Sequence, residues 1–475
     1  MQGAPIRLVL SLPPSAIRPL VKHLALRPGR RIPVTLIWHD TPDGSLATTG
    51  RTLTECHDGR RIAWRAADLR AEPMHPAGND GPVRATSPTR DALMVDLPAP
   101  CAPLARFVGH RRTARLGACT LSFLDGTLHA GRRRMPHARL ILDGPAAALA
   151  AIDLPGTALP DEPLAATALS LALRLPPPPS PLLPDITFGL TVDDTIARLL
   201  AHFGARIHRL APHAAAGPEG VHQMRVTIRR ARSALRLFRR IAPTPPSALA
   251  ALSADLKSLA AILGPARDWD VFIDGTARAV AAAAPDNPAA ASRLIRAARH
   301  ERATAGRSMR EHLASPAFHA LMRRIALAAL ARPWHHGADP ERLHIPIAAF
   351  ASHTLQRQFK RLIAPGDSLD TLPEPRLHGI RIEAKRMRYT AELFAPLFDP
   401  KRPPRFIARL ADLQECLGHL NDAAVAATLL DRLGPAGRSF GGGVARGLLA
   451  ARGDLHRPAI ARAWRRFRTT KRFWT

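Results

Sequence analysis

The feature that most constrains the fold of this chain is a basic helical segment that occurs twice. Residues 221–238 read VHQMRVTIRRARSALRLF, and residues 377–394 read LHGIRIEAKRMRYTAELF, 156 positions later. In both segments apolar residues recur three or four positions apart, which predicts two amphipathic helices. The two apolar seams consist of Val221, Met224, Ile228, Ala231, Leu235 and Phe238, and of Leu377, Ile380, Ala384, Met387, Ala391 and Phe394.

A ridge of basic residues lies next to each seam, about 100° round the helix. The first ridge consists of His222, Arg225, Arg229, Arg232 and Arg236, and the second of His378, Arg381, Lys385 and Arg388. Residues 221–238 contain no acidic residue, although solvated helices commonly pair acids with bases at i,i+4. We therefore predict that a group outside the helix neutralises the first ridge.

Each copy is followed by a second repeated pattern of leucines, a glycine and an aspartate. The two patterns are Leu256, Leu259, Leu263, Gly264, Asp268 and Val271, and Leu410, Leu413, Leu417, Gly418, Asp422 and Val425. This succession indicates an internal duplication of a helical unit. We expect helix breaks at the two glycines. Asp268 and Asp422 are then more consistent with arginine partners or helix caps than with general bases.

The charge of the chain is strongly positive and unevenly distributed. The formal net charge is +30, and residues 181–475 hold 46 Lys and Arg against 24 acidic residues. Such a field attracts polyanions, and arginine suits forked contacts with phosphate. The four cysteines have no CxxC spacing, so we interpret them as free thiols in a reducing compartment. We expect a cytoplasmic protein without signal peptide, membrane span, metal or cofactor.

Residues 1–175 have the pattern of an antiparallel α+β domain. We predict strands at residues 6–12, 34–38, 52–54, 61–64, 120–124 and 138–142, with turns at Asp58-Gly59, Asp125-Gly126 and Asp143-Gly144. We predict short helices at residues 14–26, 103–108, 145–152 and 163–173. The Pro-rich run at 176–184 predicts a stiff linker.

Residues 185–475 read as helices separated by Pro and Gly, in halves at about 185–335 and 345–475. The predicted helices span 192–210, 221–241, 247–263, 268–283, 289–313, 316–331, 345–363, 377–398, 403–417, 421–433, 444–452 and 456–467. We expect Arg230 and Arg386, which lie off the ridges, to hold the two halves together. Trp464, Phe467 and Trp474 are interpreted as packing residues.

The first part of the chain resembles the CYTH domains of the triphosphate tunnel enzymes. The resemblance rests on Trp38-His39-Asp40-Thr41-Pro42-Asp43 with Leu46, Gly50 and Leu53, on Gly131-Arg132, on residues 138–144 and on residues 164–175. It implies an eight-stranded tunnel lined with Arg and Lys for phosphates and Glu for a divalent metal. The family's ExExK signature falls near Pro5, Arg7 and Val9, so its acids and lysine are missing.

Two further segments, the LRVR-type segment and the second acidic strand, also depart from the pattern of that family. They read Leu53-Thr54-Glu55-Cys56 and Arg139-Leu140-Ile141-Leu142-Asp143. Metal-assisted chemistry on a triphosphate needs several convergent carboxylates. We therefore predict a tunnel-like fold without catalysis, in which Asp40 and Asp43 serve only as turn residues.

The second part of the chain resembles the CHAD domain, through the two basic segments and LADLQECLGHLNDAAVA at residues 411–427. The resemblance implies two pseudo-symmetric helical bundles, a basic central channel and the binding of inorganic polyphosphate. A binding site for such a ligand needs positive charges arranged in a line, and the ridges provide them. It needs no aromatic side chains on which bases could stack. The preceding helices add Arg206, Arg209, Arg357, Lys360 and Arg361 to the candidate set.

We therefore predict a non-catalytic protein that binds polyphosphate in a basic groove between the two bundles and associates with polyphosphate granules. His222 and His378 would strengthen binding in mild acid. Two alternatives stay open. One is a metal-dependent triphosphatase in the first domain. The other is nucleic-acid binding, although the single Tyr of the chain and the absence of aromatics in the ridges disfavour base stacking.

Overall fold

The structure is a computed structural model of the chain, and it describes residues 5–59, 61–68, 101–160, 164–173, 181–239, 241, 248–366, 369 and 372–474. The chain divides into two compact units. The first contains Met1–Pro181, Leu200–Arg209 and Ser315–Pro333, and the second contains Leu182–Leu199, Leu210–Ala314 and Trp334–Thr475. Most of the predicted linker at 176–184 lies outside the described residues.

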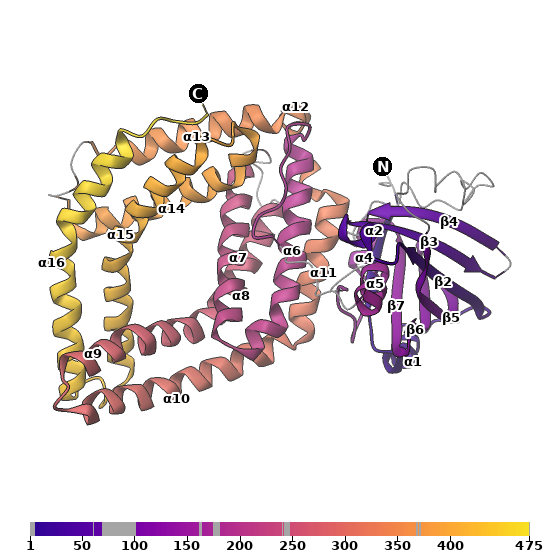
Figure 1. Cartoon of the computed structure of the whole chain (residues 1–475), viewed down its shortest axis with the longest axis horizontal. Helices are drawn as coiled ribbons and strands as arrows, with labels where there is room; N and C mark the ends of the chain where they lie inside the picture. The colour runs from indigo at the N-terminus through magenta and orange to yellow at the C-terminus, as the bar shows by residue number, and fades with distance from the viewer. Residues whose placement is uncertain are drawn as a thin grey trace. The chain divides into compact units, whose positions relative to one another are not determined.

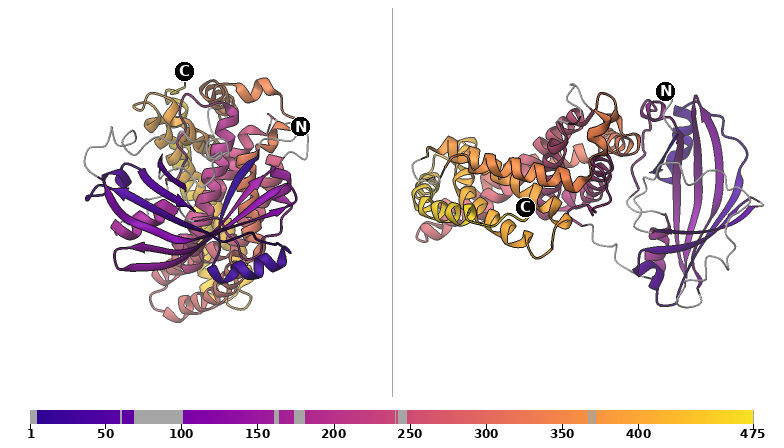
Figure 2. Two further views of the ribbon diagram at one scale, coloured as in Figure 1. Left: turned by 90° about the vertical axis from the view of Figure 1, so that its right-hand side faces the viewer. Right: turned by 90° about the horizontal axis from the view of Figure 1, so that it is seen from above.

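The first unit contains a curled antiparallel sheet that forms a half-barrel (Figures 1 and 2). Its strands are β1 (Ile6–Ser11), β2 (Ile32–Asp40), β3 (Arg51–Asp58), β4 (Arg61–Asp68), β5 (Ala102–Leu116), β6 (Cys119–Ala130) and β7 (Arg133–Gly144). Their order is β1-β7-β6-β5-β2-β3-β4, and all neighbouring pairs are antiparallel. The described residues thus supply seven strands of the eight that the CYTH resemblance implied.

Short helices accompany this sheet. They are η1 (Pro14–Ala16), α1 (Ile17–His23), α2 (Ser45–Thr48), α4 (Ala146–Ala150) and α5 (Leu164–Leu173). Alternating side chains of β2, β5 and β6 pack with Ala168 and Leu169 of α5 around the buried Trp38 and Phe107. This burial of one strand face by a helix is the usual way in which an antiparallel sheet covers its apolar side.

Two local predictions in this unit were wrong. Residues 103–108 lie in strand β5 and form no helix, and Asp125-Gly126 lies inside strand β6 and forms no turn. Gly126 faces Gly109 across the β5–β6 ladder, and a Cβ atom at Gly126 would come within 2.3 Å of the carbonyl oxygen of Val108. The glycine therefore permits a close backbone approach between strands, a use that the sequence does not distinguish from a turn.

The second part of the chain is helical, as predicted. The long helices are α6 (Val192–Ala216), α7 (Pro218–Phe238), α8 (Ala248–Val271), α9 (Arg278–Ala283), α10 (Pro288–Leu313), α11 (Pro316–Ala331), α13 (Ile347–Ile363), α14 (Glu374–Phe394), α15 (Pro403–Arg432) and α16 (Phe440–Arg468). Shorter pieces are η2 (Phe272–Ala277), η3 (Pro333–His335), α12 (Pro340–His344) and η4 (Ala395–Leu397). Thr191 begins α6 with a reciprocal capping box to Asp194, which satisfies two otherwise unpaired backbone donors.

The predicted breaks at the two repeated glycines were wrong, because the helices run through them. Helix α8 continues through Gly264-Pro265 into the π-helical turn η2 and α9, and α15 continues through Gly418. Helix α16 likewise includes Pro458, where two separate helices were expected. At Gly264 a Cβ atom would lie 3.0 Å from a guanidinium nitrogen of Arg225, so this glycine makes room for a neighbouring side chain.

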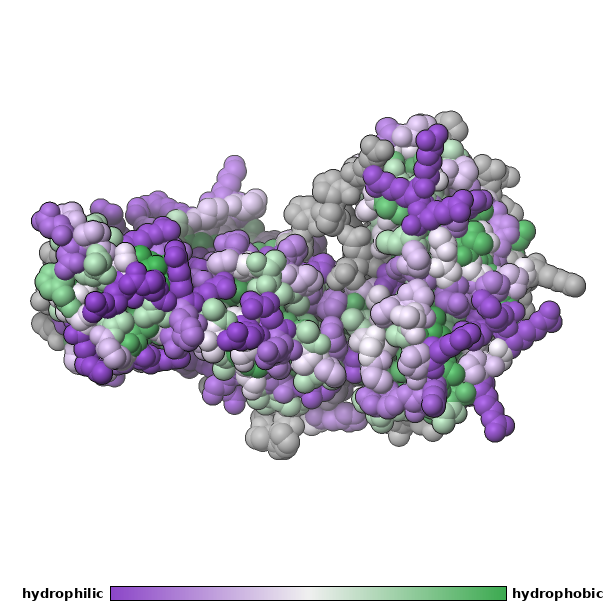
Figure 3. All heavy atoms as spheres, turned by 90° about the horizontal axis from the view of Figure 1, so that it is seen from below, coloured by the Kyte–Doolittle hydropathy of each residue, from purple (hydrophilic) through white to green (hydrophobic). Residues whose placement is uncertain are grey.

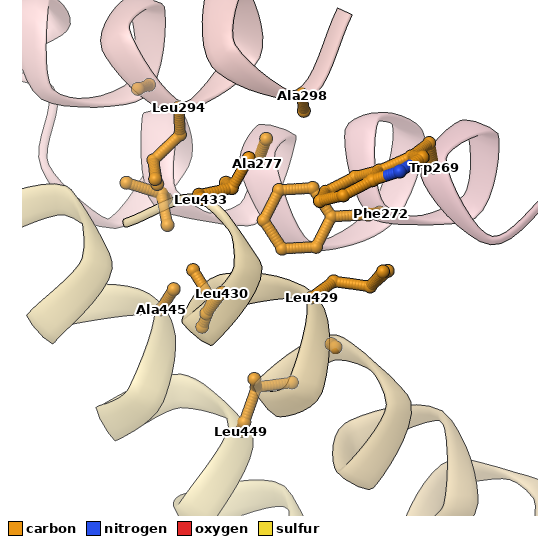
Figure 4. Close-up of a cluster of buried hydrophobic side chains, with 13 residues drawn as sticks. Trp269, Phe272, Ala277, Leu294, Ala298, Leu429, Leu430, Leu433, Ala445 and Leu449 are labelled. Carbon is orange, nitrogen blue, oxygen red and sulfur yellow. The ribbon is translucent and has the colours of Figure 1, made fainter. Parts of the chain in front are cut away.

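The continuous stretch Ala248–Ala283 is long and apolar enough to cross a membrane, judged by length and composition alone. The core helices of soluble proteins have the same properties, and this stretch contributes Trp269 and Phe272 to a buried cluster (Figure 4). Leu429 and Leu430 of α15 and Leu449 of α16 pack in the same cluster. These contacts join α8 and α9 to α15 and α16 within the second unit.

The apolar seams predicted from the repeat form the interior of the second unit. All twelve seam residues of α7 and α14 are buried, with at most 6% of any of them exposed. The repeated leucines of α8 and α15 are also buried. Burial of matching positions in both copies supports the duplication, because each helix directs the same stripe inward.

Candidate anion-binding surface on two paired helices

Helix α7 buries its apolar seam and leaves its basic ridge at or near the surface. Arg229 and Arg236 are exposed, and His222, Arg225 and Arg232 are half-buried. The Nε atom of Arg232 is buried without a hydrogen-bond partner among the described residues. The Nε of Arg230 has the same property, so the two atoms mark a closely packed group of cations on this helix.

Helices α7 and α14 lie against each other, and we call their interface the α7–α14 contact. The Nε of Arg229 donates to the hydroxyl oxygen of Tyr389 at 2.6 Å. Arg230 forms an ion pair with Glu392 at 2.5 Å, and its guanidinium lies 5.0 Å from the centre of the Tyr389 ring. The predicted role of Arg230 in holding the two halves together is therefore confirmed.

Aromatic packing continues the α7–α14 contact toward the ends of both helices. The ring of Phe238 stacks on Phe350 of α13 at 5.0 Å, and Phe350 meets Phe394 edge-on at 6.4 Å. Both Phe238 and Phe394 are fully buried, and they occupy the same position in the two copies of the repeat. The helices are thus fixed relative to each other by apolar packing as well as by ions.

Cations gather around Arg236 at the C-terminal end of α7. The side chain of Arg236 is largely exposed, but partial desolvation by the neighbouring protein lowers its pKa, and the guanidinium groups of Arg386, Arg239 and Arg232 lower it further. Glu383 acts in the opposite direction, but it also forms an ion pair with Arg386 on its own helix. This part of the surface is therefore rich in positive charge that nearby carboxylates offset only in part.

Helix α8 supplies a carboxylate to the first ridge. Asp268 lies 3.6 Å from Arg225, which is too long for a hydrogen bond, and Gly264 leaves room for that guanidinium against α8. Burial lowers the pKa of Arg225 and raises the pKa of Asp268, whereas the two groups oppose these shifts in each other. The predicted arginine partner of Asp268 is confirmed. The side chain of Asp422 lies outside the described residues.

His222 lies in the same basic surroundings. Burial lowers its pKa, and Arg267, Arg229 and Arg225 lower it further, while Glu219 raises it. The imidazole is consequently neutral in the free protein at neutral pH. It gains a proton more readily when an anion approaches, because the anion offsets the neighbouring cations.

The second ridge is only partly available to a ligand. His378 is exposed, and Arg381 and Lys385 are half-buried. Arg388 pairs with Glu392 at 2.7 Å and donates to the side-chain oxygen of Gln414 at 3.3 Å. The charge of Arg388 is therefore compensated within the protein, which the repeat alone did not indicate.

The five additional basic residues proposed from the preceding helices fall into two groups. On α13, Arg357 is half-buried, and Lys360 and Arg361 are exposed. Arg206 and Arg209 belong to the first unit. Arg206 is 9% exposed and donates to the carbonyl oxygen of Pro181 at 3.2 Å, so its inclusion in the ligand set is not supported.

Comparison with known proteins places this helical region in a family. Residues 197–431 match the family described as CHAD domain. The crystal structure of the CHAD domain from the plant Ricinus communis is 30% identical, with a TM-score of 0.50 over 62% of this chain and 98% of that chain. The chain belongs to the CHAD domain family.

A second solved structure has weaker similarity to the CHAD region. PptA from Streptomyces chartreusis is 19% identical, with a TM-score of 0.42 over 59% of this chain and 99% of that chain. No curated protein matches the sequence.

The CHAD match includes both basic helices, and the structure adds three residues that the sequence analysis did not place at the site. These are Arg267, which lowers the pKa of His222, Arg386 beside Arg236, and Tyr389 beneath Arg229. Arg386 was predicted, with Arg230, to hold the two halves together, but its ion pair in the structure is with Glu383 of its own helix. Tyr389 has serine at the matching position, Ser233, so the repeat gave no signal for it.

The half-barrel before the CHAD domain fits a CYTH-like domain, and two of its described carboxylates pair with arginines. Asp143 pairs with Arg7 at 2.7 Å, and Asp58 pairs with Arg111 at 2.8 Å. Asp40 is buried and accepts backbone N–H bonds from the turn that follows it, as predicted for a turn residue. Among the described residues, no three His, Cys, Asp or Glu side chains are placed to hold a metal ion.

The surface of the protein is mostly hydrophilic on the face drawn in Figure 3, where apolar side chains form only small patches. Large apolar side chains that are well exposed are scattered, as at Phe188 and Phe440. Isolated exposed apolar residues are common on protein surfaces. Charge is therefore the more informative property of the CHAD domain surface.

Proposed function

We propose that this protein binds inorganic polyphosphate on the basic surface of the α7–α14 contact and does not hydrolyse it. The observation that carries the proposal is the meeting of the two repeated basic helices, with Arg229, Arg232, Arg236 and Arg386 gathered where they pack. Membership of the CHAD domain family and the net charge of +30 point to the same class of ligand.

The chemistry of the surface favours a linear phosphate polymer over other polyanions. Guanidinium groups bind phosphate oxygens with paired N–H donors, and their spacing along α7 is about 5 Å per step. The one tyrosine of the chain is occupied by Arg229 and Arg230, and the ridge of α7 contains no aromatic residue. Base stacking, which supports binding of single-stranded nucleic acid, has no platform there.

The test is a titration of the full chain with long-chain polyphosphate, pyrophosphate and single-stranded DNA in a series of salt concentrations. We expect polyphosphate to bind most tightly. Its affinity should fall at least about tenfold between 50 and 200 mM salt, because counterions are released on binding. Equal or tighter binding of DNA would favour a nucleic-acid function. No binding of polyphosphate at low salt would refute the proposal.

The absence of catalysis is part of this proposal. It is supported by the ion pairs of Asp58 and Asp143, which leave these carboxylates engaged by arginines. The same preparation should release no phosphate from tripolyphosphate in the presence of Mg²⁺ or Mn²⁺. We also propose that the protein associates with polyphosphate granules in the cell, which co-localisation of a fluorescent fusion with a polyphosphate stain would test.

A further inference from the structure

The α7–α14 contact involves two positions of the repeat, each of which is present once in α7 and once in α14. They are Arg230 and its equivalent Arg386, and Arg236 and its equivalent Glu392. Arg230 of α7 pairs with Glu392 of α14. The residues that the 156-residue repeat relates to these two are Arg386 and Arg236. The pairs Arg230–Glu392 and Arg229–Tyr389 set the register of the two packed helices, and the charge of Arg386 acts on Arg236 across the contact. When the first position of each copy lies opposite the second position of the other copy, the interface has twofold symmetry.

The two halves of this reciprocal arrangement carry different charges. On one side an arginine meets a glutamate, and the pair is mostly buried, with 8% and 15% of the side chains exposed. On the other side an arginine meets an arginine, because Arg236 stands where the repeat has Glu392. The two equivalent sides of the contact therefore differ in charge, with a carboxylate on one side and a guanidinium on the other.

The side that lacks the carboxylate is surrounded by further cations. Arg232 and Arg239 flank Arg236, and Glu383 is the acidic residue that faces the group. The buried Nε of Arg232 has no hydrogen-bond acceptor among the described residues. Among the described residues whose charges act on Arg236, three guanidinium groups are therefore offset by one carboxylate.

We propose that Arg232, Arg236, Arg239 and Arg386 form a discrete anion subsite, in which a phosphate group of the ligand takes the place of the carboxylate that Glu392 supplies on the other side. This inference rests on the proposed function and locates one phosphate contact within it. Phosphate fits because it is compact, carries at least one full charge and accepts several hydrogen bonds at once.

The experiment is the substitution Arg236→Glu, which restores a carboxylate opposite Arg386. Polyphosphate affinity should fall at least about tenfold, since a charged contact is lost and a repulsive one is added. The midpoint of thermal unfolding should stay the same or rise, because the substitution replaces a like-charge contact with an ion pair. A loss of binding with an undiminished midpoint separates loss of the subsite from loss of the fold.

The matched control is Arg465→Glu, which makes the same change of charge at an exposed position in the last turn of α16. It should reduce affinity by no more than about threefold, through the general field alone. A second variant, Arg236→Gln, removes the charge without adding another and should give an intermediate loss.

The outcomes distinguish this inference from the proposed function. Wild-type protein that fails to bind polyphosphate would overturn both. Wild-type protein that binds, with equal losses in Arg236→Glu and Arg465→Glu, would overturn the subsite alone. A lower unfolding midpoint in Arg236→Glu than in the wild type would also overturn it, because the restored ion pair would then be absent.

Discussion

Arg229 and Arg230 are adjacent in the sequence and have different tasks in the structure. Arg230 is buried and neutralised by Glu392, whereas Arg229 is exposed and bonds to the hydroxyl of Tyr389. A buried charge needs a partner inside the protein, and an exposed one can exchange its partner for a ligand. At the residue scale, the position on the helix decides which arginine is exposed to an incoming ligand and which one stabilises the helix contact.

His222 gives a prediction for the effect of pH on binding. A phosphate group beside it would raise its lowered pKa, so binding would take up a proton and affinity would increase as the pH falls. We expect the affinity for polyphosphate at pH 6 to exceed that at pH 8 by about two- to tenfold. His222→Gln should remove part of this difference, as measured by titration at both pH values.

The control for this prediction is His353→Gln on an exposed face of α13, which should keep the wild-type pH dependence. An identical pH profile in the two variants would contradict the role of His222. The lowered pKa has the opposite effect on folding. The unfolded chain binds this proton more tightly, so the free energy of unfolding contributed by His222 decreases as the pH falls through about 6.5.

At the scale of helices and strands, the sequence correctly predicted which face of each repeated helix is buried. It incorrectly predicted where several helices end. The seam from Val221 to Phe238 and its repeat are buried. Their apolar residues are spaced three or four positions apart, which places them on one face of an α-helix, so this face could be predicted from the sequence. The breaks expected at Gly264 and Gly418 are absent. A glycine serves equally for a helix end or for a close approach, and only the neighbouring elements decide between these uses.

The two repeated glycines give a prediction for stability. A Cβ atom at Gly418 would meet nothing within 4 Å, so Gly418→Ala should raise the free energy of unfolding by up to about 1 kcal/mol through helix propensity. Gly264→Ala should gain less and should weaken polyphosphate binding, because its methyl group would displace the guanidinium of Arg225. Urea denaturation and titration measure the two effects.

Equal affinities in the wild type and Gly264→Ala would show that the position of Arg225 against α8 is unimportant for the ligand. A lower stability of Gly418→Ala would show that α15 is less regular at this point than the structure indicates. The candidate site was predictable to a similar extent. Both ridges were found. The pairing of Arg388 with Glu392 is an i,i+4 contact within α14 that the sequence analysis overlooked, whereas the burial of Arg206 depends on the packing of other segments around it.

At the scale of the whole molecule, the two copies of the repeat should act together on one ligand. Arg225→Glu and Arg381→Glu change equivalent positions of α7 and α14. We expect each single change to weaken polyphosphate binding and the double change to abolish it, with helix content preserved in circular dichroism. Additive charge effects on a shared polymer are the physical reason.

A double reversal at Arg465 and Arg466, both exposed on α16, is the control for total charge. It should leave most of the binding intact. Unchanged affinity in the Arg225→Glu, Arg381→Glu protein would show that the ridges are not the ligand surface. Comparable losses in both double variants would show that the overall field, without a defined path, holds the polymer.

The ion pair between Arg230 and Glu392 has a consequence for the proposed binding and release of polyphosphate. This ion pair is formed by two residues of the protein itself. The packing of α7 against α14, which positions the exposed arginines, therefore does not depend on a ligand. Binding of polyphosphate would then cost the protein little conformational entropy, and its release would require no unfolding. Polyphosphate held on such a preassembled surface would be released by a rise in ionic strength without a change in the fold.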